Sequence, residues 1–203
     1  MTDVLVIGGG LAGWRAAQAA ARAGCSVTLV ANGVGNSPQI HALNCPVRDD
    51  DSVERYVEDT MRSGKGANDR ALVETLCRGA VALKDEFAFD RQRDGTYHAI
   101  RPLGSTVPRC VSIDHAIGAV ALRQIQDELK GKVEVVEERV IALERAGRSV
   151  GVGSSVPGAP RAAEFSAPPP RFPGHERFAF SFVTVTKLFL STFSSFFSVT
   201  CTL

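Results

Sequence analysis

The sequence predicts an α/β domain built around a parallel sheet, and the arrangement of its first segments carries that prediction. The four apolar residues Val4–Ile7 form a run of the length expected for a buried strand, and residues 26–31, four of them apolar, indicate a second strand. The segment between them, residues 14–23, is rich in alanine and is interrupted by only three polar side chains, which is typical of a helix. A strand, a helix and a second strand in this order place two parallel strands in one sheet.

A glycine pattern joins the first predicted strand to the helix. Gly8, Gly10 and Gly13 match G-x-G-x-x-G directly after the apolar run. In such a turn the first glycine permits a tight bend, the second lets a pyrophosphate approach the backbone, and the third lets the helix pack closely on the strand. The helix start then presents free N–H groups and a partial positive charge to the phosphates. The pattern favours a Rossmann-like dinucleotide-binding domain over an ordinary glycine-rich turn that binds nothing.

Length and composition are those of a soluble globular protein. The 203 residues are 44% hydrophobic and 22% charged, and a net charge of +1 without a basic stripe argues against a nucleic-acid partner. The five cysteines have neither C-x-x-C spacing nor a nearby histidine cluster, so we expect reduced thiols rather than disulfides or metal ligands. The N-terminus lacks the basic segment and apolar core of a signal peptide, which makes a cytoplasmic location the expectation.

The end of the second predicted strand departs from the usual pattern of NAD-binding sites. In a dinucleotide fold this strand commonly ends on a carboxylate that binds the ribose hydroxyls, whereas Ala31 and Asn32 stand there. The ribose contact is then either missing or made by an amide. Residues 32–46 are rich in glycine and proline and have little periodicity, so they predict an extended loop at the carboxyl edge of the sheet, where a ligand should lie.

Two helices are predicted in the next part of the chain. Capping residues at 50–52 begin a helix that runs to about Arg62 and stops at Gly64. Its apolar side chains fall on one face: Val53, Tyr56, Val57 and Met61. Asn68 or Asp69 caps a longer helix. The face predicted to be buried on that helix consists of apolar residues at helical spacing: Leu72, Leu76, Ala80, Leu83 and Phe87.

A hairpin, a further helix and three strands follow. Asp94-Gly95 is a turn signal that predicts the hairpin, and Asp114 is expected to cap a helix that stops at Gly131. The inward side of this helix consists of apolar residues: Ile117, Ala121, Leu122, Ile125 and Leu129. Residues 133–136 are predicted to form one strand, and residues 140–143 and 149–152 a strand pair joined by a turn.

With these residues laid out, four stretches resemble the flavoprotein family of fumarate reductase, succinate dehydrogenase and L-aspartate oxidase. They are residues 6–13, 51–64, 68–73 and 102–109, of which the second and third are the more specific. The segment 140–152 is also similar to the strand-turn-strand of that family. The likeness covers about residues 1–152 and implies the N-terminal part of an FAD-binding domain. A small residue at the place of Ala31 agrees with this family.

The resemblance implies FAD as the cofactor and suggests its contacts. The pyrophosphate would lie on the glycine turn: Gly8, Gly10, Leu11, Ala12 and Gly13. The ribose would face Ala31 and Asn32, the backbone at Val140 would meet the adenine, and Ser37 and Asn44 would belong to the loop that meets the flavin ring.

The same resemblance bears on how the flavin is attached to the chain and on which residues are catalytic. Some family members bind flavin through a histidine of this loop; His41 is the candidate, but Ser37 falls nearer the family's histidine, so we expect a non-covalent polar contact. The side chains that act on a dicarboxylate in the family lie in later segments, which nothing after residue 152 matches, so the catalytic residues stay unassigned. Arg101, Arg109 and His115 are expected at the surface or near the phosphates.

Composition changes abruptly after residue 152. The last 53 residues hold nine of the 11 phenylalanines and six of the 10 prolines, but only six charged side chains. We expect domain sequence over 1–152, a Pro/Gly/Ser-rich linker over 153–174 and a Phe/Ser/Thr-rich tail over 175–203, unrelated to the fold. The tail is long enough for a membrane span, but its ten hydroxyl side chains and Lys187 argue against one. A truncated or frame-shifted product with an incomplete FAD-binding domain explains this change best.

Three functional hypotheses follow. The first is the FAD-binding portion of a fumarate reductase-like or aspartate oxidase-like oxidoreductase. Complete relatives of this kind act on small dicarboxylates, and we expect the present chain alone to show no catalytic turnover. The second is a non-catalytic nucleotide-binding module tethered by its C-terminal segment. The third is an NAD(P)-binding Rossmann oxidoreductase, and the absence of an acid or arginine at residues 31–32 weighs against it.

Overall fold

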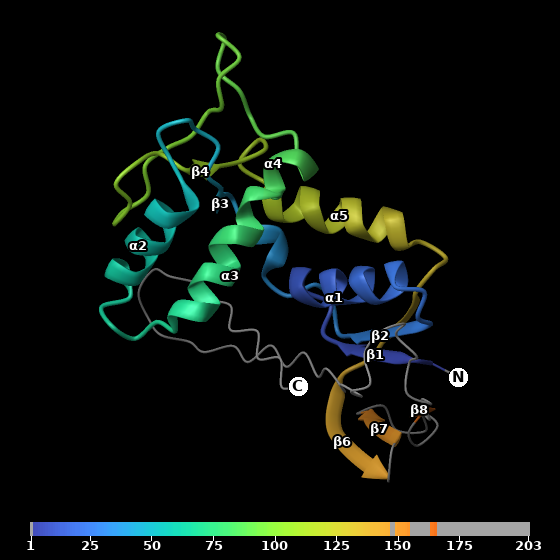
Figure 1. Ribbon diagram of the computed structural model, residues 1–203. Coiled ribbons are helices and arrows are strands. Elements are labelled where there is room, and N and C mark those ends of the chain that lie inside the picture. Colours follow the sequence, from blue (N-terminus) through green and yellow to red (C-terminus); the bar gives the residue numbers. More distant parts are fainter. Residues whose placement is uncertain (1, 147–148, 155–162, 166–203) are drawn as a thin grey trace. The chain divides into compact units, whose positions relative to one another are not determined.

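The computed structural model describes residues 2–146, 149–154 and 163–165 (Figure 1). The tail predicted over residues 175–203 lies outside the described residues, as does most of the predicted linker. The chain divides into two compact units, a first unit of Met1–Ser37 with Leu122–Leu203 and a second unit of Pro38–Ala121. Each unit has a hydrophobic core of its own.

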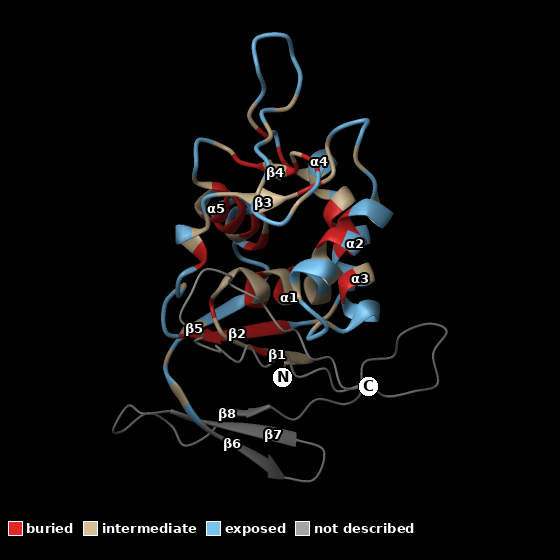
Figure 2. Cartoon of the chain, turned by 90° about the vertical axis from the view of Figure 1, so that its left-hand side faces the viewer, coloured by how far each residue is buried: buried red, intermediate tan, exposed pale blue. Residues whose placement is uncertain are grey.

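A three-stranded parallel sheet forms the centre of the first unit. Strand β2 (Val27–Ala31) lies between β1 (Val4–Ile7) and β5 (Glu134–Glu137). All five residues of β2 are buried (Figure 2). Helix α1 (Leu11–Arg22) connects β1 to β2, so the predicted parallel strand-helix-strand unit is confirmed.

Helix α1 and the later part of helix α5 (Ile117–Leu129) supply the rest of this core (Figure 1). The core consists of apolar side chains from the sheet and both helices: Val6, Trp14, Ala17, Val27, Leu29, Ala31, Leu122, Ile125 and Leu129. Beside this core, the buried Gln18 and the exposed Arg22 of α1 both donate to the carboxylate of Glu128 on α5, at 2.7 and 2.8 Å. The inward face predicted for α5 is buried throughout.

Two helices begin at residues other than those predicted. Helix α1 begins at Leu11 rather than residue 14, so Gly13 lies in its first turn. Helix α5 begins at Ile117, which puts the N-cap position on Ala116. The predicted cap at Asp114 was wrong because the chain makes an extra turn there, in which the Ala116 N–H donates to the Ile113 carbonyl at 2.8 Å.

An antiparallel sheet follows β5 in the first unit. It contains β6 (Val140–Ala146), β7 (Ser149–Ser154) and β8 (Ala163–Phe165), with β7 in the middle. Ala146 pairs with Ser149, which confirms the predicted strand pair, and the turn predicted between the two strands lies outside the described residues. Strand β8 falls in the range that composition assigned to a linker.

The second unit combines helices with a short antiparallel sheet. Its helices are α2 (Val53–Ser63), α3 (Arg70–Val81) and the short α4 (Leu83–Glu86), and its strands are β3 (Leu43–Asn44) and β4 (Cys110–Val111). The core formed by α2 and α3 consists of five buried side chains: Tyr56, Val57, Val73, Cys77 and Ala80.

Side-chain caps begin both long helices of the second unit, as predicted. The Ser52 hydroxyl accepts a hydrogen bond from the Arg55 N–H at 3.1 Å, and the Asp69 carboxylate accepts one from the Leu72 N–H at 3.1 Å. Each cap satisfies a donor that the first helical turn leaves without an intrahelical partner. These side chains explain why α2 and α3 begin where they do.

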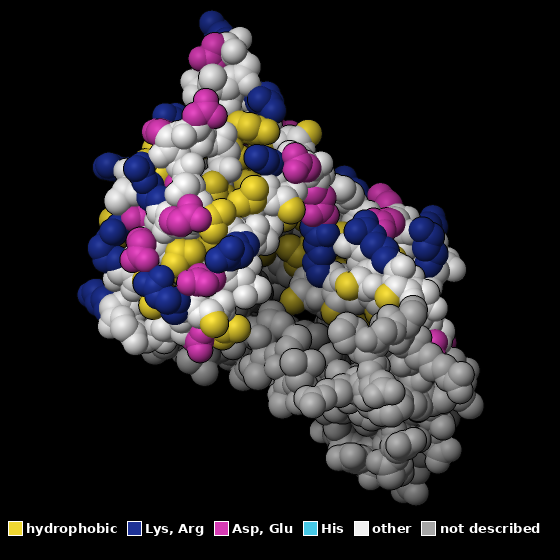
Figure 3. All heavy atoms as spheres, viewed as in Figure 1, with side chains coloured by type: hydrophobic (Ala, Val, Ile, Leu, Met, Phe, Trp, Pro, Cys, Tyr) yellow, Lys and Arg dark blue, Asp and Glu magenta, His cyan; other side chains and the backbone are white. Residues whose placement is uncertain are grey.

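The buried face of α3 differs from the prediction. The prediction was wrong for Leu72 and Leu76, which are 59% and 54% exposed, and is confirmed for Ala80 and Phe87, which are buried. Val73 and Cys77, which were not predicted, are buried on α3 beside Ala80. Both series are apolar and both have helical spacing, so spacing alone does not decide which of them meets α2. On the face in Figure 3, apolar side chains lie among interspersed acidic and basic ones.

The predicted hairpin is present in the second unit. Arg91 and Tyr97 pair antiparallel, and the Gln92 N–H donates to the Thr96 carbonyl at 2.8 Å. Gly95 occupies the turn with a φ of +85°, a conformation that favours glycine. The Arg91 guanidinium carbon lies 4.0 Å from the centroid of the Tyr97 ring.

The cysteines that the structure describes are free thiols: Cys25, Cys45, Cys77 and Cys110. Burial raises the pKa of each thiol, that of Cys45 to about 11, and this disfavours the reactive thiolate. No helix in the described part of the chain has the length and apolar character needed to cross a membrane. No cluster of three or more histidine, cysteine or acidic side chains suited to a metal occurs among the same residues.

Candidate functional site

The turn between β1 and α1 packs backbone against backbone. Gly8 has a φ of +113°, and its N–H donates to the Val30 carbonyl of β2 at 2.8 Å. A Cβ atom on Gly13 would lie 1.9 Å from the Gly8 carbonyl oxygen, and one on Gly9 would lie 2.3 Å from the Gly33 carbonyl oxygen. Neither position has room for a side chain. The glycines therefore hold the helix against the strand and against the loop that follows β2.

The start of α1 presents backbone N–H groups toward this turn. Gly10 is the N-cap residue and has no capping side chain. The buried hydroxyl of Ser37, from the loop after β2, accepts a hydrogen bond from the Leu11 N–H at 2.8 Å instead. The N–H groups of Ala12 and Gly13 follow in the first turn, where no intrahelical acceptor exists. That turn contains no acidic side chain, so the positive end of the helix dipole is available to an anion.

The carboxyl ends of β2 and β5 lie side by side at the same edge. Ala31 ends β2, and its Cβ lies 2.7 Å from the position that a Cβ on Gly9 would take. Glu137 ends β5 and is the register partner of Ala31. The Glu138 N–H donates to the Ala31 carbonyl at 3.1 Å, so the strands stay paired to their ends. Asn32 follows β2 and is exposed.

Most of the residues singled out from the sequence come together in the first unit. At the carboxyl edge and the turn beside it lie Gly8, Gly10, Leu11, Ala12, Gly13, Ala31, Asn32 and Ser37. Val140 also belongs to this unit and begins β6. Asn44 lies in β3 of the second unit. Sequence reasoning missed Glu137, because the predicted strand stopped at residue 136; an acid that ends a third parallel strand was the available signal.

The loop after β2 contains more regular structure than predicted. It includes a 3₁₀ turn, η1 (Ser37–Gln39), and strand β3. His41 is exposed in the second unit, and its Nδ1 hydrogen-bonds with the His115 carbonyl at 2.8 Å. Because a carbonyl only accepts, Nδ1 carries the proton there. The His41 carbonyl accepts a hydrogen bond from the Ser112 hydroxyl.

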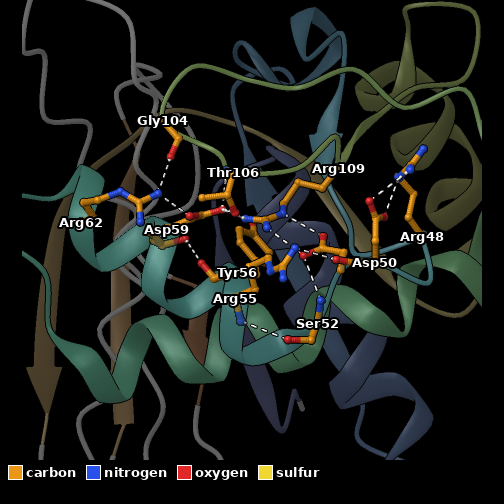
Figure 4. Close-up of polar contacts among 12 residues, drawn as sticks. Arg48, Asp50, Ser52, Arg55, Tyr56, Asp59, Arg62, Gly104, Thr106 and Arg109 are labelled. Atoms are coloured by element: carbon orange, nitrogen blue, oxygen red, sulfur yellow. Dashed lines mark hydrogen bonds and ion pairs between the residues drawn. The ribbon is translucent and has the colours of Figure 1, made fainter.

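A buried ion cluster is the main electrostatic feature of the second unit (Figure 4). Arg109 is fully buried, and its Nε and Nη2 donate to the two oxygens of Asp51 at 2.9 and 2.8 Å. Its Nη1 lies 2.9 Å from Asp59 Oδ2, an ion pair without hydrogen-bond geometry. The guanidinium carbon lies 4.8 Å from the centroid of the Tyr56 ring. Two carboxylates thus compensate one buried cation.

This cluster corrects the expectation for Arg109. The surface or phosphate-neighbouring position predicted for it was wrong, whereas Arg101 and His115 are exposed. Asp51 was a candidate helix cap, but its carboxylate pairs with Arg109, 58 residues further along the chain. Sequence spacing carries no signal for such a long-range ion pair.

Asp59 ties helix α2 to the segment 102–109. Burial acts to raise the pKa of Asp59, but hydrogen bonds from the Thr106 N–H and hydroxyl, together with Arg62 and Arg109, hold this pKa below its ordinary value. Arg62 also donates to the Gly104 carbonyl at 3.1 Å. The contacts are internal to the second unit and assign these residues a structural role.

Comparisons with known proteins place this geometry in context. Residues 3–160 match a family model described as FAD binding domain. Among solved structures, the Sdh1 complex of Mycobacterium smegmatis in its apo form is 25% identical, with a TM-score of 0.66 over 75% of this chain and 30% of that chain. An open conformation of a flavocytochrome c3 fumarate reductase is 25% identical, with a TM-score of 0.63 over 74% and 30%.

A mutated E. coli quinol fumarate reductase shares the fold, with 21% identity and a TM-score of 0.67 over 75% of this chain and 29% of that chain. The chain therefore spans about 30% of the length of the solved structures to which it is similar. Comparison with curated protein sequences finds no match.

Proposed function

This chain belongs to the FAD binding domain family, and we propose that it is the nucleotide-binding portion of a flavin-dependent oxidoreductase whose β1–α1 turn holds the FAD pyrophosphate. The observation that carries the proposal is the start of α1. There the Ser37 hydroxyl and the N–H groups of Ala12 and Gly13 gather at the positive end of a helix dipole whose first turn contains no acid.

The residues of the turn fit a pyrophosphate. Phosphate oxygens accept hydrogen bonds and must come close to the backbone to reach its N–H groups. A Cβ on Gly10 would lie 3.1 Å from Ser37 Oγ, so any side chain there would crowd the space between the helix start and the loop. Glycine at this position keeps that approach open for an anion.

The adenosine half of FAD is assigned to the neighbouring strand ends. We assign the ribose to the edge at Ala31 and Asn32, and the adenine to the backbone at Val140. The absence of a carboxylate at Ala31 does not conflict with the family, whose model matches across this edge and supports FAD rather than NAD(P). Ser37 holds the loop beside the phosphates, and we expect the flavin to be bound non-covalently.

Bound FAD supplies hydride transfer at its flavin ring, while the protein binds and orients the cofactor. We further propose a small dicarboxylate as the substrate class of the oxidoreductase, because two of the similar solved structures are fumarate reductases. The proposal assigns cofactor binding to the described residues and leaves the catalytic residues unassigned.

A flavin titration tests the proposed function. The purified chain is mixed with increasing FAD, and binding is followed by flavin fluorescence and absorbance, with NAD⁺ and NADP⁺ as competitors. We expect one saturable FAD site that neither nicotinamide cofactor displaces. After denaturation, the flavin should leave with the small-molecule fraction; colour that stays on the chain would instead indicate attachment through His41. No saturable binding at high FAD would contradict the proposal.

A further inference from the structure

We infer that Glu137 supplies the ribose-binding carboxylate that the end of β2 lacks. The inference rests on the proposed FAD site. In dinucleotide folds, an acid at the end of the second strand accepts hydrogen bonds from the ribose hydroxyls. This chain has Ala31 in that place, whose methyl group can make no such bond, and the neighbouring strand β5 ends on an acid at the same level.

Backbone pairing fixes the position of Glu137 at the end of β5 relative to Ala31 at the end of β2. Glu137 is the register partner of Ala31, and neighbouring strands lie about 4.8 Å apart. The hydrogen bond from the Glu138 N–H to the Ala31 carbonyl, at 3.1 Å, closes the pairing just beyond Glu137. A glutamate side chain is long enough to cross one strand spacing. Its carboxylate can therefore reach the place that an acid on β2 would take.

The side chain of Glu137 leaves the sheet on the correct face. Register partners in a parallel sheet point to the same side. Leu29 and Ala31 face the core beneath α1. Thr28 points to the opposite face, where it hydrogen-bonds with its register partner Glu134, and Glu137 lies an odd number of residues from Glu134 along β5. Glu137 therefore projects on the face of Ala31, and Ala31 lies against the glycine turn at Gly9.

The carboxylate of Glu137 is available for a ligand. The residue is exposed, and in the part of the chain that the structure describes no hydrogen bond or ion pair involves its side chain. An ionised carboxylate only accepts, which suits the two hydroxyl donors of a ribose, and such charge-assisted bonds are stronger than neutral ones. Asn32 at the same edge offers an amide, which cannot supply a negative charge.

The order of residues along the chain matches the order of groups in the cofactor. A ribose joins the pyrophosphate to the adenine in FAD. Glu137 stands at the end of the sheet beside the glycine turn proposed for the pyrophosphate. Three residues later, Val140 begins the strand whose backbone is proposed for the adenine. Glu137 therefore lies between the proposed contacts of the pyrophosphate and the adenine, which is where the ribose of FAD belongs.

The inference is tested by FAD affinity rather than by turnover. Glu137→Gln in the full chain removes the charge and keeps the size of the side chain. We expect the FAD dissociation constant to rise about tenfold or more, in line with hydrogen bonds to a charged group. Glu138→Gln is the matched control, with the same change one residue further on, and its dissociation constant should stay within about twofold.

A second ligand separates the ribose contact from general electrostatics. FAD that lacks both hydroxyls of the adenosine ribose should bind the unmodified chain and the Glu137→Gln chain with equal affinity, because the partner of the carboxylate is gone. Equal loss of affinity for FAD and for this analogue on substitution would overturn the ribose contact.

The remaining outcomes are distinct. An unmodified chain that binds FAD, together with a Glu137→Gln chain that binds it equally well, would overturn the inference and leave the proposed function intact. An unmodified chain that binds no FAD would overturn both. Circular dichroism of the cofactor-free variants verifies that each is folded.

Discussion

Gly13 is constrained by one contact, because a Cβ there would lie 1.9 Å from the Gly8 carbonyl oxygen. Gly13→Ala should push α1 away from β1, lower the free energy of unfolding by about 1–3 kcal/mol and abolish FAD binding at concentrations that saturate the unmodified chain. Gly79→Ala is the control: its added Cβ meets no atom within 4 Å, and alanine favours a helix by about 1 kcal/mol. Denaturant unfolding and FAD titration of both variants test this prediction. Normal FAD affinity in Gly13→Ala would refute the role of Gly13 in the FAD site.

Ser37 caps a helix from a distant loop, whereas Ser52 caps the helix that begins next to it. Replacement of either serine by alanine should lower the free energy of unfolding by about 1 kcal/mol, since each removes one capping hydrogen bond. Only Ser37→Ala should also weaken FAD binding, because only Ser37 lies at the glycine turn. The pair is compared by denaturant unfolding and fluorescence titration. Equal FAD affinity in the two variants would separate Ser37 from the cofactor site.

At the scale of elements, the cluster around Arg109 fastens α2 to the segment 102–109. Arg109→Met should lower the free energy of unfolding by about 3–5 kcal/mol, because it leaves the carboxylates of Asp51 and Asp59 buried without their cation. Arg101→Met, at an exposed site immediately before this segment, should change the free energy of unfolding by no more than about 0.5 kcal/mol. Equal stability of the two variants in urea would contradict the structural role of the cluster.

The pKa of Asp59 makes this fastening sensitive to acid. Because the pKa of Asp59 in the folded state lies below its ordinary value, the stability that ionised Asp59 contributes is fully present above the unfolded pKa of about 3.9. This stability is lost as the pH falls through the folded pKa. Stability should therefore decline below about pH 4, and the decline should be shallower in Asp59→Asn, which has no proton to take up. Urea unfolding over a series of acidic pH values measures both slopes. Parallel slopes would show that Asp59 does not contribute.

Helix α3 offers a direct test of its buried face. Val73→Ala should lower the free energy of unfolding by about 2 kcal/mol, since it removes buried methyl groups, whereas Leu76→Ala should change it by no more than about 0.5 kcal/mol. Urea unfolding of the two variants measures the difference. A larger loss for Leu76→Ala would mean that the exposed series is covered in solution.

Local patterns predicted most elements, because strands, caps and turns depend on neighbouring residues. The glycines of the β1–α1 turn, the Ser52 cap and the turn at Gly95 are examples. Contacts between distant segments carried no comparable signal. The pairing of Asp51 with Arg109 spans 58 residues. The place of Glu137 in the site depends on a strand register that only the folded sheet fixes.

At the scale of the whole molecule, FAD should stabilise the unit that binds it. A ligand at 100 times its dissociation constant adds about 2.7 kcal/mol to the stability of the state that binds it. Added FAD should therefore raise the melting temperature in a concentration-dependent way, and NAD⁺ should not. If the two units melt separately, FAD should shift only the transition of the first. Calorimetry measures this, and an unchanged profile at saturating FAD would argue against a cofactor site in the first unit.

The first unit is assembled from two segments, Met1–Ser37 and a part that begins at Leu122, and this arrangement governs how the nascent chain folds. Thr28 in the central strand contacts Glu134, 106 residues later. At a synthesis rate of about 5–20 residues per second, β2 waits roughly 5–20 s for its second neighbour. Ribosome-bound chains arrested before residue 134 emerges should thus be cut readily by protease within residues 1–37, and longer ones should resist. During translation, β2, which is fully buried in the folded unit, therefore exposes unpaired backbone groups with which a wrong strand can pair until β5 has been made.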